Sequence, residues 1–248
     1  MGWREGTTRR RALGFIAAGS IAGSSSIIGA HAQNAQPADV DLSLVLAVDA
    51  SGSVNQVRFE LQKRGYVDAF ANRQVLTAIR SGPNAAIGAM MFQWTGPGRQ
   101  VPVVPWTRIS DETSTDRFAG AIAATQRQLF GGGTSISGAI DAGVHVLAET
   151  PFRGGRRVID ISGDGANNRG RPAEQARDAA VAAGININGV AILEVEPDLE
   201  EHFRNNVIGG PGAFVVPAET FQDFGNAILR KLILEIADRS LPGHSLQG

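Results

Sequence analysis

An almost unbroken apolar run at residues 42–48 (LSLVLAV) constrains the fold more than any other feature of the sequence. A strand that is apolar on both faces has to be covered on both sides, which is typical of the centre of a parallel sheet flanked by helices. Downstream of this run, strand-like segments alternate with segments whose apolar residues recur at helical spacing. This alternation predicts an α/β domain.

One pair of predicted strands has to be antiparallel. The apolar segment at residues 86–94 is followed by the turn sequence Thr95-Gly96-Pro97-Gly98 and then by an extended segment at residues 100–106. So short a connection forces a hairpin, because a parallel return needs a crossover of about a dozen residues or more. The other predicted strands are residues 157–161, 185–193 and 213–216.

Helices are predicted between these strands. Phe59, Tyr66 and Phe70 lie at helical spacing in a segment that ends near Asn72. Further helices are predicted at residues 118–129, 136–147, 172–183, 196–206 and 221–236. We therefore expect one domain at residues 40–240, a single doubly wound, Rossmann-like and mostly parallel sheet with one antiparallel edge strand and helices on both faces.

The N-terminus has the pattern of an export signal. Paired arginines at Arg9-Arg10-Arg11 precede a weakly apolar stretch, and Ala30-His31-Ala32 supplies a small-x-small cleavage pattern. We interpret residues 1–32 as a signal peptide of the twin-arginine type in preference to the general secretory type. An N-terminal anchor and a basic leader are the alternatives, but residues 19–26 are too polar for a good spanning helix.

This interpretation predicts a bacterial protein in the periplasm or otherwise exported, with no stable membrane span after signal removal. Residues 33–39 are expected to be a linker and residues 241–248 a C-terminal tail.

Charge and cysteine content exclude several functions. Residues 1–32 hold four arginines and one glutamate, so the remainder of a chain with 23 basic and 24 acidic residues carries a formal charge of about −4. Nucleic-acid binding needs clustered positive charge, so no nucleic-acid partner is expected. The chain contains no cysteine, which excludes disulfides, thiolate zinc sites and cysteine nucleophiles.

Oxygen-bearing side chains follow the predicted strands at one edge of the sheet. Asp49, Ser51 and Ser53 come directly after the first strand, Thr134 follows a run of three glycines, and Asp164 follows the strand at residues 157–161. Helix capping would explain the first three alone. Because ligands bind at the carboxyl ends of strands in doubly wound sheets, we expect all five to cluster there. Hydroxyl and carboxylate ligands without nitrogen or sulfur suit Mg²⁺ first, and Ca²⁺ or Mn²⁺ as alternatives.

With these five residues in order, the sequence resembles the von Willebrand factor A superfamily. The metal-ion-dependent adhesion site of that superfamily has the pattern D-x-S-x-S, then a Thr, then an Asp. The likeness covers about residues 37–240. Residues 94–109 and 161–168 also resemble a bacterial exported branch of the superfamily whose function is undefined.

The resemblance implies a role for each residue. Ser51, Ser53 and Thr134 would touch the metal directly, and Asp49 and Asp164 largely through water. A Glu or Asp carboxylate from a protein partner would complete the octahedron. The expected function is thus an exported, metal-dependent protein-binding module of the adhesion or scaffold kind.

Two alternatives to a binding module remain open. A metal-assisted phosphoester hydrolase could use Asp49 as a nucleophile, but the motif offers no activating base or lysine, and the mature chain has no G-x-S-x-G elbow or P-loop lysine. We therefore expect no enzyme. The other alternative is a structural subunit whose five oxygens are satisfied internally, without metal.

Six other residues also have predicted roles. Asp160 lies inside an apolar strand, where a charge needs a partner, so a structural role is expected. Asn167 and Asn168 are expected to form a left-handed turn, with a supporting role beside the metal as the alternative. His145 is expected in packing or on the surface. Trp94 and Trp106 flank the hairpin, where they would pack together or mark a partner surface.

Overall fold

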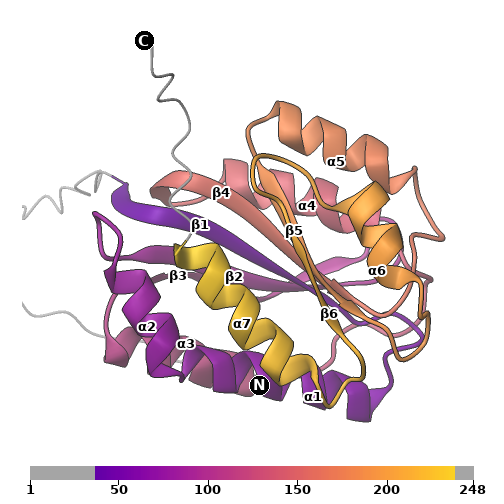
Figure 1. The fold of residues 1–248 in the computed structure, drawn as a ribbon, viewed down its shortest axis with the longest axis horizontal. Helices are drawn as coiled ribbons and strands as arrows, with labels where there is room; N and C mark the ends of the chain where they lie inside the picture. The colour runs from indigo at the N-terminus through magenta and orange to yellow at the C-terminus, as the bar shows by residue number, and fades with distance from the viewer. Residues whose placement is uncertain (1–36, 238–248) are drawn as a thin grey trace, which may run out of the picture. The chain divides into compact units, whose positions relative to one another are not determined.

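A six-stranded sheet forms the centre of residues 37–237, the part of the chain that the computed structural model describes (Figure 1). The strand order is β3-β2-β1-β4-β5-β6, and all neighbours are parallel except β2 and β3. The strands are β1 (Ala38–Asp49), β2 (Ile87–Trp94), β3 (Gln100–Ile109), β4 (Phe152–Gly163), β5 (Asn186–Ile192) and β6 (Val215–Ala218).

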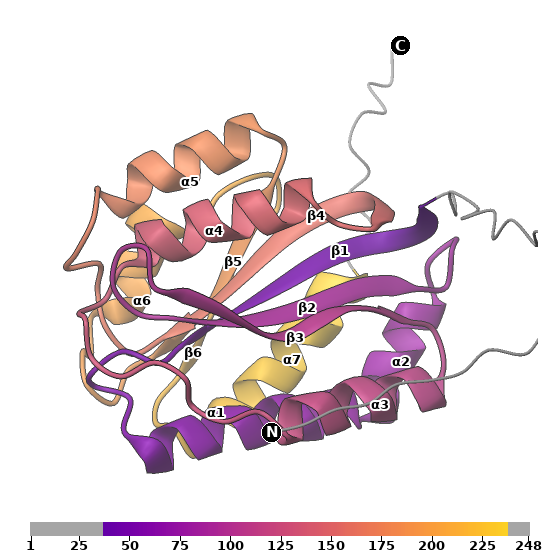
Figure 2. The same cartoon turned by 180° about the vertical axis from the view of Figure 1, so that it is seen from behind.

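Helices cover both faces of this sheet. In Figures 1 and 2, α1, α2, α3 and α7 lie on one face, and α4, α5 and α6 lie on the other. The helices are α1 (Gln56–Phe70), α2 (Arg73–Arg80), α3 (Glu112–Ala123), α4 (Ile136–Ala148), α5 (Ala173–Ala182), α6 (Leu199–His202), the π-helical turn η1 (Phe203–Val207) and α7 (Phe224–Ala237).

Strand β1 joins two hydrophobic cores because successive side chains of a strand point to opposite faces. Leu44 and Leu46 pack in the core beneath α1, α3 and α7, whereas Val45 and Ala47 pack in the core beneath α4 and α5. Because β1 lies between β2 and β4, it is covered on both faces, as its apolar sequence predicted.

Both edge strands of the sheet contain proline. β3 holds Pro102 and Pro105, and the four-residue β6 holds Pro217. Proline has no backbone N–H to donate to a neighbouring strand and is found in sheets mainly at edges and bulges. The sequence places these prolines only where the sheet ends.

The predicted doubly wound sheet with one antiparallel edge strand is confirmed, and most predicted elements lie within a few residues of those observed. The predicted start of the domain at residue 40 falls inside β1. The predicted export signal and the C-terminal tail lie outside the described residues. Within residues 37–237, no helix has the length and apolarity needed to cross a membrane.

The helix predicted at residues 118–129 is wrong in its second half, since α3 ends at Ala123. Beyond it, the side chain of Gln93 binds the backbone on both sides of residue 127. Its Nε2 donates to Gln126 O at 2.7 Å, and its Oε1 accepts from Gln128 N at 2.7 Å. This buried amide satisfies backbone groups that helical hydrogen bonds would otherwise satisfy, so the chain leaves the helix and runs toward the end of the sheet.

Two further details differ from the prediction. Helix α2 was not predicted; Asn72 caps it, and it buries Val75 and Ile79. The expected packing of Trp94 against Trp106 is wrong, because Trp94 pairs with Gln100 at the hairpin end whereas Trp106 lies near the other end of β3. There Trp106 packs edge-to-face on Phe152, with ring centroids 6.1 Å apart.

Candidate metal centre

Three loops meet at the carboxyl end of the parallel strands (Figure 2). Asp49 is the last residue of β1, Asp164 directly follows β4, and β1 and β4 are neighbours in the sheet. Ser53 Oγ donates to Asp164 Oδ1 at 2.6 Å, and Ser51 Oγ lies 3.2 Å from Ser53 Oγ. The structure thus brings together residues that the chain separates by more than a hundred positions.

Thr134 comes from the third loop, which precedes α4. A Cβ added at Gly165 would lie 3.7 Å from Thr134 Oγ1, which places the threonine beside the loop that holds Asp164. The backbone of Thr134 is fixed, since its N–H donates to Asn168 Oδ1 at 2.9 Å and its carbonyl accepts from Asn168 N at 2.9 Å. Its hydroxyl makes no hydrogen bond to the residues the structure describes, so it remains available to a ligand.

The glycine run before Thr134 is required by backbone geometry. Gly131, Gly132 and Gly133 have φ values of 68°, 99° and 81°, in the left-handed region that side chains disfavour. A Cβ at Gly133 would also lie 2.6 Å from Arg169 Cγ. The three glycines therefore let the loop turn sharply into α4, which Ser135 caps by accepting from Gly138 N.

The turn after β1 is held by a hydrogen bond within it and by others from Gln62 and Arg127. Ser51 N donates to Asp49 Oδ1 at 2.7 Å, and Gln62 Nε2 donates to Asp49 O at 3.2 Å. Arg127 Nη2 donates to Ala50 O at 3.1 Å and to Ser51 O at 2.8 Å. These contacts fix the positions of the serine hydroxyls before any ligand binds.

Two carboxylates of this site are buried and form no ion pair with a basic side chain of residues 37–237. Asp49 and Asp164 are fully buried, and the Oδ2 atom of each accepts no hydrogen bond within residues 37–237. Burial, and next the charge of Asp164, raise the pKa of Asp49 to about 7. Burial is also the main cause that raises the pKa of Asp164. A buried carboxylate is costly unless a cation or hydrogen bonds compensate it, so this pair fits a bound metal ion.

The nearby arginines do not supply that cation directly. Arg127 binds backbone carbonyls, and burial lowers its pKa although the charge of Asp49 opposes this. Arg58 donates to Ser53 O at 2.8 Å and to Glu194 Oε1 at 2.7 Å. The side chains of the five predicted site residues supply hydroxyls and carboxylates, and this donor set suits a hard divalent ion.

Glu196 is a third carboxylate that the sequence did not point to. Its Oε2 accepts from Ala166 N at 2.8 Å, and its Oε1 would lie 3.3 Å from a Cβ at Gly165. Its charge also contributes to the raised pKa of Asp164. The only signal available was its position just after the strand predicted at residues 185–193, at the same edge of the sheet.

The other sequence candidates have structural roles. Neither Asn167 nor Asn168 has a positive φ, so the predicted left-handed turn is wrong. The side chain of Asn168 accepts from Thr134 N at 2.9 Å, and its supporting role beside a metal stays a prediction. Asp160 has the expected partner, because its Oδ2 lies 2.9 Å from the Nζ of Lys231. His145 lies on the surface, 3.5 Å from Glu149.

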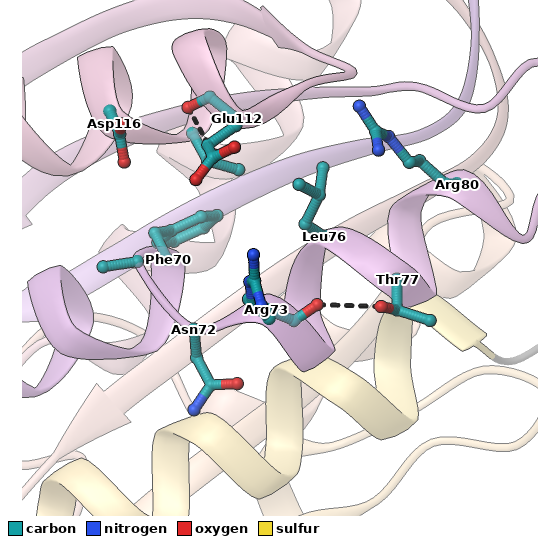
Figure 3. Close-up of a pocket in the computed structure, with 10 residues that line it drawn as sticks. Phe70, Asn72, Arg73, Leu76, Thr77, Arg80, Glu112 and Asp116 are labelled. Atoms are coloured by element: carbon teal, nitrogen blue, oxygen red, sulfur yellow. Dashed lines mark hydrogen bonds between the residues drawn. The ribbon is translucent and has the colours of Figure 1, made fainter.

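A separate cavity of about 210 Å³ lies away from this centre, between the end of α1, α2 and the start of α3 (Figure 3). Its charged side chains include Arg73, Arg80, Glu112 and Asp116. Thr77 Oγ1 donates to Arg73 O at 2.9 Å on its wall. None of the five predicted site residues lines it.

This sheet topology, with the D-x-S-x-S turn after β1, defines the von Willebrand factor A fold, and comparison with solved structures agrees. Proximal thread matrix protein 1 from the mussel byssus, solved with a zinc-occupied metal-ion-dependent adhesion site, is 16% identical with a TM-score of 0.54. The match covers 82% of this chain and 49% of that chain.

Two bacterial structures give similar results. A von Willebrand factor type A protein from Catenulispora acidiphila is 13% identical with a TM-score of 0.52, covering 80% of this chain and 43% of that one. The pilus adhesin SpaC from Lactobacillus rhamnosus GG is 15% identical with a TM-score of 0.55, covering 83% and 31%. This chain thus spans about half the length of these proteins or less.

The chain belongs to the family described as "Protein of unknown function (DUF1194)", whose model matches residues 39–240. No curated protein sequence matches it significantly. The family match begins at the second residue of β1 and includes every later helix and strand through α7.

Proposed function

We propose that this protein binds a divalent cation through Asp49, Ser51, Ser53, Thr134 and Asp164, and through that cation a carboxylate of a partner protein. The observation that carries the proposal is the pair of buried carboxylates whose Oδ2 atoms have no partner within the described domain. The Ser51, Ser53 and Thr134 hydroxyls supply neutral ligands beside them. With so few negative charges, a bound divalent ion would keep its attraction for an outside carboxylate.

Mg²⁺ is the ion we propose first, with Mn²⁺ and Ca²⁺ as alternatives, because the donors are all oxygens. The zinc in the related site of the mussel protein supports divalent binding in general. We also propose that the protein acts outside the cytoplasm as an adhesion or scaffold module, on the basis of the signal-like sequence at residues 1–32.

The metal site is tested by thermal unfolding with and without cation. We expect millimolar Mg²⁺ or Mn²⁺ to raise the Tm of the wild-type protein by several degrees, because a ligand at about 100 times its Kd stabilises the folded state by about 2.7 kcal/mol. Asp49→Ala should abolish this rise, whereas Asp116→Ala, at an exposed carboxylate on α3, should keep it. An unchanged wild-type melting curve would refute the metal site.

Hydrolysis has less support than binding. Asp49 would need an activating group, yet Lys63 pairs with Glu60, Lys231 is buried on α7, and His202 Nε2 lies 3.4 Å from Asn167 N as its acceptor. A screen of the metal-loaded protein against generic phosphoesters separates the two functions. Turnover that disappears in Asp49→Ala would replace the binding proposal by the enzymatic one.

A further inference from the structure

Three arginines surround the glycine run that leads to Thr134, and we call them the arginine arc: Arg99, Arg127 and Arg169. A Cβ at Gly132 would lie 3.4 Å from Arg99 Cδ, and a Cβ at Gly133 would lie 2.6 Å from Arg169 Cγ. Arg127 lies on the segment that leads into the glycine run and donates to Ser51 O at 2.8 Å, in the turn after β1. Segments that are distant in the sequence thus place three positive charges beside the metal centre.

The arginine arc has no carboxylate partner within residues 37–237, since none of its members forms an ion pair there. Arg99 and Arg169 are exposed, and the Nε of Arg127 is buried without a hydrogen bond. Two other arginines near the same end of the sheet are paired. Arg58 lies 2.7 Å from Glu194, and Arg171 lies 2.5 Å from Asp141. The charges of Arg99 and Arg169 are therefore left for an outside group.

Phe130 is an exposed aromatic residue beside the arginine arc. The side chain of Phe130 is 62% exposed, which is unusual for so large an apolar group. The guanidinium carbon of Arg127 lies 4.7 Å from the centroid of its ring, which keeps the ring in place at the surface. Exposed aromatic residues beside arginines are typical of the centre of protein–protein interfaces.

The loop after β5 brings the other charge to the metal centre. Glu196 lies next to Gly165, whereas the charge of Glu194 is compensated by Arg58, 2.7 Å away. A negatively charged partner segment is thus attracted by the arginine arc and repelled by Glu196.

We propose that the partner segment carries several carboxylates in succession, one on the metal and the next ones on Arg99 and Arg169, with Phe130 contacting an apolar side chain between them. This inference rests on the proposed metal-dependent function and specifies its ligand. An acidic peptide fits better than a nucleic acid, because nucleic-acid binding needs an extended surface of clustered positive charge, whereas residues 33–248 carry a formal charge of about −4 and the arc has only three arginines.

A fluorescent hexa-aspartate peptide tests the proposal by anisotropy in low salt with Mg²⁺. Wild-type protein should bind it, and chelator should release it. The double variant Arg99→Glu/Arg169→Glu should bind at least tenfold more weakly. Its Mg²⁺-induced rise in Tm should match that of wild type, because neither arginine touches the five site residues through its charged group. Arg64→Glu/Arg230→Glu, an equal charge reversal at exposed positions of α1 and α7, should leave the affinity unchanged.

The outcomes separate this inference from the proposed function. Absence of any Mg²⁺-induced rise in Tm refutes the metal site itself. A normal rise with equal peptide affinity in wild type and the double variant overturns the arginine arc alone. No binding of millimolar peptide by wild type, or binding that survives chelator, also overturns it. Displacement of the peptide by a single-stranded oligonucleotide at equal concentration would overturn the proposed acidic partner segment, because it would identify the arginine arc as a phosphate-binding surface.

Discussion

At the scale of single residues, the candidate site divides into residues that the sequence could predict and residues that it could not. Asp49, Ser51 and Ser53 share one turn, and strand order alone places Asp164 beside them. Glu196 reaches the centre only because of the path of the loop after β5. Loop conformation depends on individual contacts rather than on periodicity, so its side chains could not be placed from the sequence.

We expect Glu196→Gln to weaken Mn²⁺ or Mg²⁺ binding roughly tenfold, the effect typical of losing a supporting group around a metal. The amide keeps the size of the side chain and can still accept from Ala166 N, so the fold should be retained. Isothermal titration with Mn²⁺ measures the change. Glu201→Gln, at an exposed position of α6, is the matched control. Equal Kd values for both variants would show that Glu196 does not act on the metal.

At the scale of elements, α7 is attached to the sheet by a buried ion cluster. Lys231 Nζ lies 2.9 Å from Asp160 Oδ2 on β4 and 2.8 Å from Glu235 Oε2, and Asn188 Nδ2 donates to Glu235 Oε1 at 2.8 Å. All of these side chains are at most 4% exposed. One cation faces two carboxylates, so the cluster holds an excess negative charge in the core.

This excess predicts a pH dependence of stability. Burial, only partly offset by Lys231, raises the pKa of Asp160 from 3.8 to about 7, and Glu235 adds to the rise. Between about pH 4 and pH 7 the folded protein retains a proton that the unfolded chain loses, so the free energy of unfolding falls as pH rises through this window. Asp160→Asn removes the titrating group and leaves Lys231 paired with Glu235.

Urea unfolding at pH 5 and pH 8, with chelator present throughout, checks this prediction. Wild type should lose more stability between the two pH values than Asp160→Asn does. Lys231→Met is the contrasting variant, because it leaves two buried carboxylates without a cation and should cost about 3–5 kcal/mol. Parallel pH profiles for wild type and Asp160→Asn would mean that Asp160 does not titrate in this window.

The elements also show where sequence patterns fail. The stripe of α3 continued in the sequence to Leu129, but the side chain of Gln93 ends the helix by binding Gln126 and Gln128. The strands were predictable because burial on both faces leaves a long apolar signal, as in β1. A contact between one side chain and a distant backbone segment leaves no such signal.

At the scale of the whole molecule, the two cores depend on each other because alternate residues of β1 belong to each. We expect the domain to unfold in a single transition. Trp94 and Trp106 report on the core beneath α4 and α5, whereas Phe118 belongs to the core on the other face. Phe118→Ala should cost about 3–5 kcal/mol.

Tryptophan fluorescence and circular dichroism in urea test this coupling. Both midpoints should fall together in Phe118→Ala, although the substitution lies across the sheet from the tryptophans. Val57→Ala, at an exposed residue of α1, is the control and should leave both midpoints in place. A fluorescence midpoint that does not move in Phe118→Ala would show that the two faces unfold separately.

The prolines of β3 and β6 affect which surfaces of this protein can bind other proteins. An incoming strand aligned along either edge would meet residues without a backbone N–H to donate, which disfavours the addition of a further strand. A second copy or an extended peptide would gain fewer hydrogen bonds by lengthening this sheet than by lengthening one without prolines at its edges. Copies at high concentration are correspondingly less prone to associate edge to edge.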